Sequence, residues 1–236
     1  MLPEKIPPDW TSNDLVELGG TAMATGKTRL LVAIAGGTCS GKSTAAAVLN
    51  VRFARSVTIQ LDDFYFDLRD MTEADTRSYD FDSPQAFDAD AAVAAVEALL
   101  AGSPAYVPAY DRRTHRRLDG RRVNPADLIL LDGMYAIALA ERMDQRFSQR
   151  RVYCDCSEGL RRQRREMREI EASTVSRSFA EYWAVAEHHF NADILPQRSR
   201  AELVLDTSRL GVLEELLAVV ARWRSEAKTA SEQRSL

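Results

Sequence analysis

The chain has 236 residues, of which 45% are hydrophobic and 28% charged, and its formal net charge is −4. This length fits one large domain, or one domain with a lid, and supplies enough apolar side chains for a buried core. The negative charge argues against general nucleic-acid binding, which needs a basic surface. No segment reaches the roughly 18 apolar residues of a membrane-spanning helix, and the N-terminus lacks the layout of a signal peptide, so we expect a cytoplasmic protein with no membrane partner.

Residues 1–27 are weakly patterned and predict an N-terminal extension, followed by a main domain over residues 28–225 and a polar, frayed tail over residues 226–236. Within the main domain, short apolar runs alternate with segments of helical spacing. The runs predict strands at 30–35, 57–61, 128–131, 151–156 and 203–205. The spacings predict helices at 42–55, 90–100, 134–147, 158–171, 178–194 and 210–223. This alternation predicts an α/β fold with a parallel sheet flanked by helices and functional loops at the carboxyl ends of the strands.

The segment Gly-Gly-Thr-Cys-Ser-Gly-Lys-Ser at 36–43 lies between the first predicted strand and the first predicted helix. It fits the G-x-x-x-x-G-K-[ST] pattern of loops whose backbone N–H groups surround nucleotide phosphates at a helix N-terminus. Lys42 would reach the β- and γ-phosphates of ATP, and Ser43 would be a ligand of Mg²⁺; a plain glycine turn would need neither side chain. The residues expected to bind ATP are Gly36, Gly37, Thr38, Cys39, Ser40, Gly41, Lys42, Ser43 and Thr44.

Two carboxylates follow buried strands and would meet the phosphate loop at the same edge of the sheet. Asp62 is the candidate for the carboxylate that orients an acceptor hydroxyl and takes its proton, although it could also be a metal-linked acid or a helix cap. Asp132 is the candidate for the second metal-linked acid, which would hold Mg²⁺ through water. The alternative for Asp132 is a turn residue beside Gly133.

The predicted helix 158–171 is rich in arginine, and its arginines recur at three- and four-residue spacing on one face. A row of guanidinium groups matches phosphate oxygens and suits a closing lid, which we expect at about 157–175. Such a charged run is otherwise a solvated helix face, paired in part with neighbouring glutamates. The arginines on this face are Arg161, Arg164, Arg165 and Arg168, and Arg162 belongs to the same helix.

The segment 105–110 is extended but contains Pro108, which suits a sheet edge or a hairpin. The residues that follow combine Tyr110 and His115 with several arginines. A polar hairpin would look the same, but a site for a flat polar ring would also use an aromatic face and a donor–acceptor histidine.

The chain has three cysteines, too few for a disulfide framework. Cys39 is either a small tolerated side chain in the phosphate loop or a thiol whose pKa is lowered by a helix N-terminus. Cys154 and Cys156 alternate along a predicted strand, which indicates core positions.

Taken together, these motifs resemble the uridine–cytidine kinase group within the uridine kinase and phosphoribulokinase superfamily, over residues 30–206. The resemblance implies a P-loop kinase fold with a five-stranded parallel sheet of order 2-3-1-4-5, an Arg-rich lid and a nucleoside-binding hairpin. It also implies transfer of the ATP γ-phosphate to the 5′-hydroxyl of a ribonucleoside, with Mg²⁺. The motifs are GGTCSGKS at 36–43, LDDFY at 61–65, YDFDSPQAFD at 79–88, PAYDRRTHRR at 108–117, LILLDG at 128–133 and the arginines at 161–168.

Roles carried over from the resemblance extend the candidate site. Asp62 and Lys42 would act in catalysis together with the lid arginines Arg164 and Arg168, which would lie near the phosphates. The metal would be held by Ser43 and Asp132. The residues expected to bind the nucleoside are Asp82 at the ribose hydroxyls, Tyr110 and His115 at the pyrimidine ring, and Arg161 at the sugar.

One departure from the family pattern bears on the acceptor. Arg112 stands where pyrimidine kinases tend to carry an aromatic residue, so the preference among uridine, cytidine and other nucleosides stays open. Nicotinamide riboside, pantothenate and a sugar phosphate stay open as acceptors, and GTP as donor. A nucleotide-binding regulator without kinase activity is a rival that the absent N-K-x-D motif disfavours. Self-association into a homo-oligomer also stays open.

Overall fold

The structure is a computed structural model, and it describes residues 28–172 and 179–234. The predicted N-terminal extension and residues 173–175 of the predicted lid lie outside these ranges. Within them, no helix has the length and apolarity needed to cross a bilayer.

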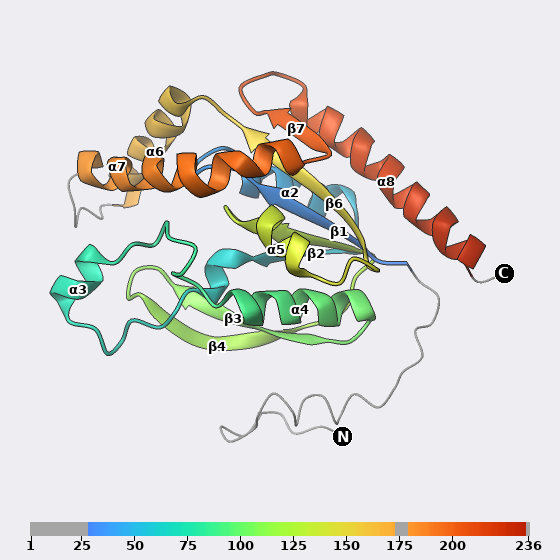
Figure 1. Ribbon diagram of the computed structural model, residues 1–236, viewed down its shortest axis with the longest axis horizontal. Coiled ribbons are helices and arrows are strands. Elements are labelled where there is room, and N and C mark those ends of the chain that lie inside the picture. The colour runs from blue at the N-terminus through green and yellow to red at the C-terminus, as the bar shows by residue number, and fades with distance from the viewer. Residues whose placement is uncertain (1–27, 173–178, 235–236) are drawn as a thin grey trace.

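A parallel five-stranded sheet forms the centre of the molecule (Figure 1). The strands lie in the order β2-β5-β1-β6-β7, which confirms the predicted order 2-3-1-4-5. Every neighbouring pair in it is parallel, with Ile34 of β1 opposite Asp132 of β5 and Val152 of β6. The strands are β1 (Leu30–Ala35), β2 (Ser56–Gln60), β5 (Leu128–Asp132), β6 (Ser148–Asp155) and β7 (Leu203–Asp206).

Successive side chains of β1 point to opposite faces of the sheet, and each face packs against helices. An unbroken apolar run therefore suits this strand. Leu30, Val32 and Ile34 pack into a core with α2 (Lys42–Arg52) and α8 (Val212–Arg234). The residues between them face the opposite core, with α4 (Ala89–Ala101) and α5 (Ala136–Arg142). Because both faces of the sheet are covered, each side chain of β1 is buried in one core or the other.

The predicted helices differ from the observed ones mainly at their ends. Asp88 caps α4 by accepting the N–H of Ala91 at 3.0 Å, and Gly102 ends it with φ 93°. The first helix ends at Arg52 rather than at 55, and the helix predicted at 134–147 is only α5, Ala136–Arg142. The segment 67–88, for which no helix was predicted, contains the short helix α3 (Glu73–Ser78), which Thr72 caps.

The helix predicted at 178–194 corresponds to α7 (Phe179–His189) and the π-helix η2 (Phe190–Ile194), and the 3₁₀-helix η3 (Leu195–Arg200) follows directly. Pro196 lies in the first turn of η3, where a missing N–H costs no hydrogen bond. The tail after Ser225 is not frayed, because α8 runs to Arg234 and buries Ala227.

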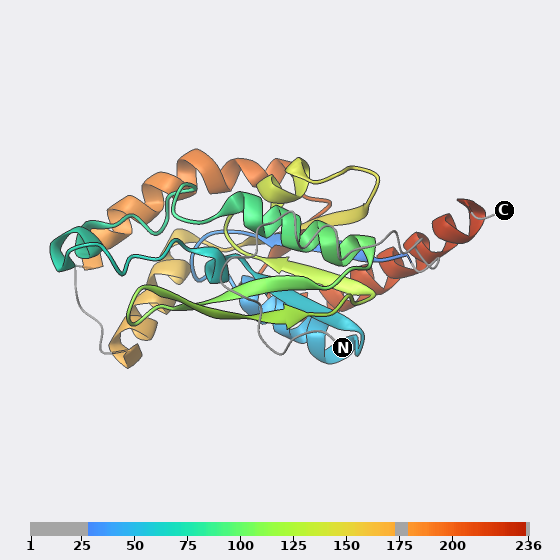
Figure 2. The same cartoon turned by 90° about the horizontal axis from the view of Figure 1, so that it is seen from below.

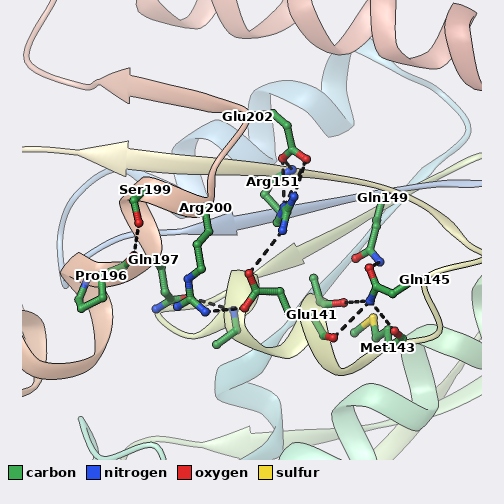
Figure 3. A network of polar contacts seen from close by, with 12 residues as sticks. Glu141, Met143, Gln145, Gln149, Arg151, Pro196, Gln197, Ser199, Arg200 and Glu202 are labelled. Atoms are coloured by element: carbon green, nitrogen blue, oxygen red, sulfur yellow. Dashed lines mark hydrogen bonds and ion pairs between the residues drawn. The ribbon is translucent and has the colours of Figure 1, made fainter.

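A polar network ties η3 to α5 and β6 (Figure 3). Gln197 of η3 is fully buried. It accepts the N–H of Ala138 in α5 at 3.0 Å and donates to the carbonyl of Met134, just before α5, at 2.9 Å. The Glu141 carboxylate forms ion pairs with Arg151, 3.4 Å away, and with Arg200. Arg151 forms a second ion pair with Glu202, at 2.9 Å. The network therefore fixes the chain segment directly after Asp132.

The segment 105–123 is an antiparallel hairpin apart from the main sheet, which confirms the hairpin prediction. It consists of β3 (Ala105–Asp111) and β4 (Arg116–Val123), with a register shift around Pro108. The hairpin tip, α3, α6 (Glu158–Ala172) and α7 gather at the end of the molecule to which the sheet strands point (Figures 1 and 2). The candidate site residues come from these elements and from the loops at that end.

Candidate active site

The phosphate loop has the backbone that its glycines predict. Gly36 has φ 142°, and a Cβ there would lie 2.5 Å from the carbonyl oxygen of Cys154, so no larger residue fits. Gly41, with φ 95°, precedes α2, and Cys39 also takes a positive φ of 55°. The Lys42 ammonium donates to the Gly37 carbonyl at 2.7 Å, which holds its charge over the loop.

Ser43 and Asp132 meet at the edge of this loop. The Ser43 hydroxyl hydrogen-bonds to the Asp132 carboxylate, which is buried at the end of β5. Burial raises the pKa of Asp132, while the nearby Lys42 ammonium opposes the rise. A hydroxyl and a carboxylate beside a phosphate site form the small protein ligand set that Mg²⁺ uses together with water and phosphate oxygens. These two residues therefore fit the predicted metal site.

Asp62 lies in the 3₁₀-helix η1 (Leu61–Phe64) and lines a small cavity with Tyr65, Phe81 and Met134. It does not cap a helix, because η1 has Gln60 at its N-cap and no side-chain cap bond. The Asp62 carboxylate is 38% exposed and forms an ion pair with Arg112 from the hairpin turn. Asp62 is thus at a pocket wall, open to an acceptor, and not in the apolar interior.

Asp82 forms a second carboxylate on the acceptor side of the site. It is 7% exposed, and burial raises its pKa to about 6, with the Arg165 guanidinium opposing this rise. Asp62 contributes to the same shift, so the two carboxylates are close enough to interact. The Tyr135 hydroxyl donates to the Asp82 carbonyl and holds the backbone of this residue.

The hairpin brings Tyr110 and His115 to the same wall. The His115 ring stacks on Phe81 with centroids 4.9 Å apart, and the Tyr110 ring lies 5.3 Å from Tyr65. Among the described residues, neither the Tyr110 hydroxyl nor His115 Nδ1 has a hydrogen-bond partner, although both atoms are buried. Burial raises the pKa of Tyr110 to about 12 and lowers that of His115, so both groups are neutral near pH 7. Unpaired buried polar atoms of this kind are suited to a polar ligand.

The helix α6, the predicted lid, contacts the phosphate loop through Arg164. Its guanidinium donates to the Cys39 carbonyl at 3.2 Å and to the Thr207 carbonyl at 3.4 Å. Thr207 in turn donates to the Ser40 carbonyl at 2.8 Å, so the loop, α6 and the turn after β7 are joined. Arg168 is exposed on the same helix.

Comparison with known proteins identifies the family. The profile of the "Phosphoribulokinase / Uridine kinase family" matches residues 31–211, which is most of the chain. The chain belongs to this family.

Individual relatives agree with this assignment. The uridine kinase of Latilactobacillus sakei is 29% identical over 185 residues, covering 76% of this chain and 86% of that protein. Uridine-cytidine kinase A of Dictyostelium discoideum is 31% identical over 189 residues. The chain spans only 36% of the length of the Dictyostelium protein and 38% of uridine kinase-like protein 4 of Arabidopsis thaliana.

Among solved structures, the phosphoribulokinase from Rhodobacter spheroides superposes with a TM-score of 0.57, covering 78% of this chain and 74% of that one at 16% identity. At this identity, the similarity supports the fold alone. It agrees with the P-loop kinase architecture of the five-stranded sheet.

Arg161, which was expected at the sugar, lies between α6, α7 and η2. Its side chain is 1% exposed, and its guanidinium is 2.8 Å from Glu187 and 3.9 Å from the Phe190 ring centre. It also donates to the Cys156 carbonyl at 3.3 Å. A Cβ at Gly37 would lie 3.0 Å from Arg161 Nη1, so this guanidinium also borders the phosphate loop, and its contact with the sugar stays a prediction.

Two residues at the kinase site, Arg165 and Tyr182, had no individual role among the predicted site residues. Arg165 provides the largest opposing charge to Asp82, and its guanidinium lies 4.3 Å from the ring centre of Tyr182 on α7. The Tyr182 hydroxyl hydrogen-bonds to Thr38 of the phosphate loop. Arg165 shares the arginine spacing of Arg164, but no local pattern marks Tyr182, because its contacts come from the packing of α7 over the loop.

The cysteines of the kinase domain lie as predicted where the structure tests them. Cys154 and Cys156 are buried, and burial raises the pKa of Cys154 to about 12, which leaves an unreactive thiol. Cys39 is partly exposed within the loop, and its redox sensitivity stays a prediction that no observation tests.

Proposed function

We propose that this kinase transfers the γ-phosphate of ATP to the 5′-hydroxyl of a ribonucleoside, with uridine and cytidine as the first candidates. The observation that carries the proposal is the position of Asp62. Its carboxylate is close enough to interact both with Asp132, beside the phosphate loop, and with the buried Asp82. The phenol of Tyr110 and the imidazole of His115 contact Tyr65 and Phe81, which line the same cavity as Asp62. In a nucleoside, the 5′-hydroxyl would face Asp62, the vicinal ribose hydroxyls would face Asp82, and the polar base would lie against the phenol and the imidazole.

Each of these residues would have a separate role in phosphoryl transfer. Lys42 and the loop N–H groups would hold the triphosphate, and Ser43 and Asp132 would hold Mg²⁺. The metal would supply positive charge to the phosphate oxygens. Asp62 would orient the acceptor hydroxyl and take its proton, for which its partly exposed carboxylate is suited. Arg164, already bonded to the loop, and Arg168 would add positive charge from the lid.

On the acceptor side, Asp82 would accept hydrogen bonds from the ribose hydroxyls, and Tyr110 and His115 would contact the base. The two uridine kinases of lactobacilli match this chain over 86% of their own length, which supports a nucleoside acceptor. We propose that the reaction takes place in the cytoplasm.

Arg112 favours one second candidate, an acceptor that carries a phosphate or another anion. Its guanidinium pairs with Asp62 and is 60% exposed, so an anionic acceptor could replace the carboxylate as its partner. A sugar phosphate has this chemistry. A vitamin precursor or nicotinamide riboside would use the same wall without that contact.

A panel assay separates these acceptors. Purified protein is incubated with ATP and Mg²⁺ and, in turn, uridine, cytidine, nicotinamide riboside, pantothenate and a pentose phosphate, and ADP release is measured. The proposal predicts the highest kcat/KM with uridine or cytidine. A preference for the pentose phosphate would replace the nucleoside by an anionic acceptor, and ADP release that no acceptor stimulates would point to a nucleotide-binding regulator.

A further inference from the structure

His189 lies where α7 passes into η2, with each ring nitrogen facing a carboxylate. Nε2 is 2.7 Å from Asp80 Oδ2, and Nδ1 is 3.0 Å from Asp193 Oδ2. A carboxylate only accepts hydrogen bonds, so a ring that bonds to both must carry a proton on each nitrogen. The side chain is 14% exposed, which limits competition from water. Burial alone would lower the pKa of His189, but its hydrogen bonds to Asp193 and Asp80 outweigh that effect and raise it.

Asp80 connects this histidine to the acceptor wall. While its Oδ2 faces His189, its Oδ1 accepts the backbone N–H of Asp82 at 3.1 Å. The Asp82 carbonyl is held from the other side by the Tyr135 hydroxyl. The backbone of Asp82 is therefore fixed at both its N–H and its carbonyl, and the N–H contact depends on a carboxylate that His189 orients.

We propose that His189 is a positioning residue for the acceptor: by bridging Asp193 to Asp80, it fixes the turn that presents the Asp82 carboxylate to vicinal hydroxyls. This inference rests on the proposed function of Asp82. His189 itself does not touch the acceptor. It makes acceptor binding depend on the position of α7, the helix that follows the lid.

The inference predicts two limbs in the pH profile of kcat/KM for the acceptor. Below about pH 6, Asp82 becomes protonated and accepts fewer hydrogen bonds, so kcat/KM falls. At higher pH, His189 loses one proton and one of its two bonds, and kcat/KM falls again above the raised pKa of this histidine. The titratable groups that face His189 are Asp193 and His188 on its own helical segment and Asp80 and Asp82 on the segment 79–88. Tyr135, near α5, interacts with these aspartates.

The first test uses uridine as the probe and compares His189→Gln with His188→Gln, a matched change at the neighbouring exposed histidine. His189→Gln should raise KM for uridine about tenfold, the worth of a hydrogen bond to a charged group. It should leave KM for ATP unchanged and remove the alkaline limb, because glutamine does not titrate. Asp80→Asn should raise KM for uridine in the same direction. A His189→Gln enzyme that matches His188→Gln in KM and in pH profile overturns the inference.

The second test needs no acceptor and so separates this inference from the proposed function. The chain has three histidines, so their ring signals in ¹H–¹⁵N spectra of the labelled wild-type protein can be assigned with the two glutamine variants. We expect His189 to titrate above its ordinary value of 6.5, and Asp80→Asn and Asp193→Asn to lower its pKa. A His189 ring that titrates at or below 6.5, or whose pKa neither aspartate variant changes, contradicts the bridge. A wild-type enzyme that ignores uridine while His189 titrates as expected refutes the nucleoside proposal instead.

Discussion

The two halves of the site are built differently. On the donor side, Lys42 and Ser43 follow the loop directly, and Asp132 ends the strand beside β1, so neighbours in sequence or sheet complete the arrangement. The acceptor side combines η1, the segment 79–88, the hairpin turn and, through Tyr182, α7. The geometry of the donor side is therefore set by a local motif at the carboxyl ends of neighbouring strands. The geometry of the acceptor side is set by packing between segments that are far apart in the chain.

The halves also differ in how their polar groups are satisfied. Lys42 and Arg164 bond to loop carbonyls, and Ser43 bonds to Asp132. On the acceptor side, the buried hydroxyl of Tyr110 and Nδ1 of His115 have no partner among the described residues. We infer that the donor half carries the chemistry common to P-loop kinases and that the acceptor half carries the specificity.

Lys42→Ala should have the largest effect, because it removes the ammonium expected at the γ-phosphate from the donor half. We expect kcat to fall by at least about 10³-fold, as for loss of a group that stabilises developing charge. ADP release with saturating uridine measures this. The melting temperature serves as the control for folding, since turnover near the wild-type rate in a folded variant would remove Lys42 from the chemistry.

Asp62→Asn tests the residue that connects the halves. The amide keeps the size of the side chain but cannot take a proton, so kcat should fall by roughly 10²- to 10⁴-fold, the usual worth of a general base. Arg112→Ala is the matched control, because it breaks the same ion pair from the other side and leaves the carboxylate in place. An unchanged kcat in Asp62→Asn would contradict the role of this carboxylate.

His115→Ala should affect only the acceptor half. It removes a half-buried imidazole that stacks on Phe81, so KM for uridine should rise about tenfold, with KM for ATP unchanged. Steady-state kinetics with each substrate varied in turn measure the two constants. An equal rise in both would mean that the hairpin supports the donor side as well.

Glu202→Gln should have the smallest effect and serves as a reference away from both halves. Glu202 pairs with Arg151 in the partly exposed network of Figure 3, so the free energy of unfolding should drop by about 1 kcal/mol or less. Urea denaturation measures this, and both KM values should stay as in the wild type. A change in KM for uridine would show that this network reaches the acceptor wall.

The same contrast explains what the sequence could predict. The strand at Leu30–Ala35, the phosphate loop and the start of α2 are set by contiguous residues, and all three were predicted at their observed positions. The strand order and hairpin followed from the resemblance to known kinases, and the structure confirms both. The 3₁₀-helix η3 was not predicted, because no side chain caps its start, and a proline is as common in the first turn of a helix as in a loop that ends one.

Contacts between distant segments were not predictable from spacing. Arg161 belongs to the same arginine row as Arg164, yet one is buried against Glu187 and the other bonds to the phosphate loop. The difference arises from α7, which packs on one side of α6. The pairing of Arg112 with Asp62 depends likewise on where the hairpin turn lies, which no local pattern determines.

The identity of the product tests the central claim most directly. Wild-type protein is incubated with uridine, ATP and Mg²⁺, and the product is examined by proton-coupled ³¹P NMR. The account predicts uridine 5′-monophosphate, with the phosphorus coupled to the two 5′ protons, formed in step with ADP. Phosphate transferred to another position, or ADP formed without a phosphorylated nucleoside, would contradict it.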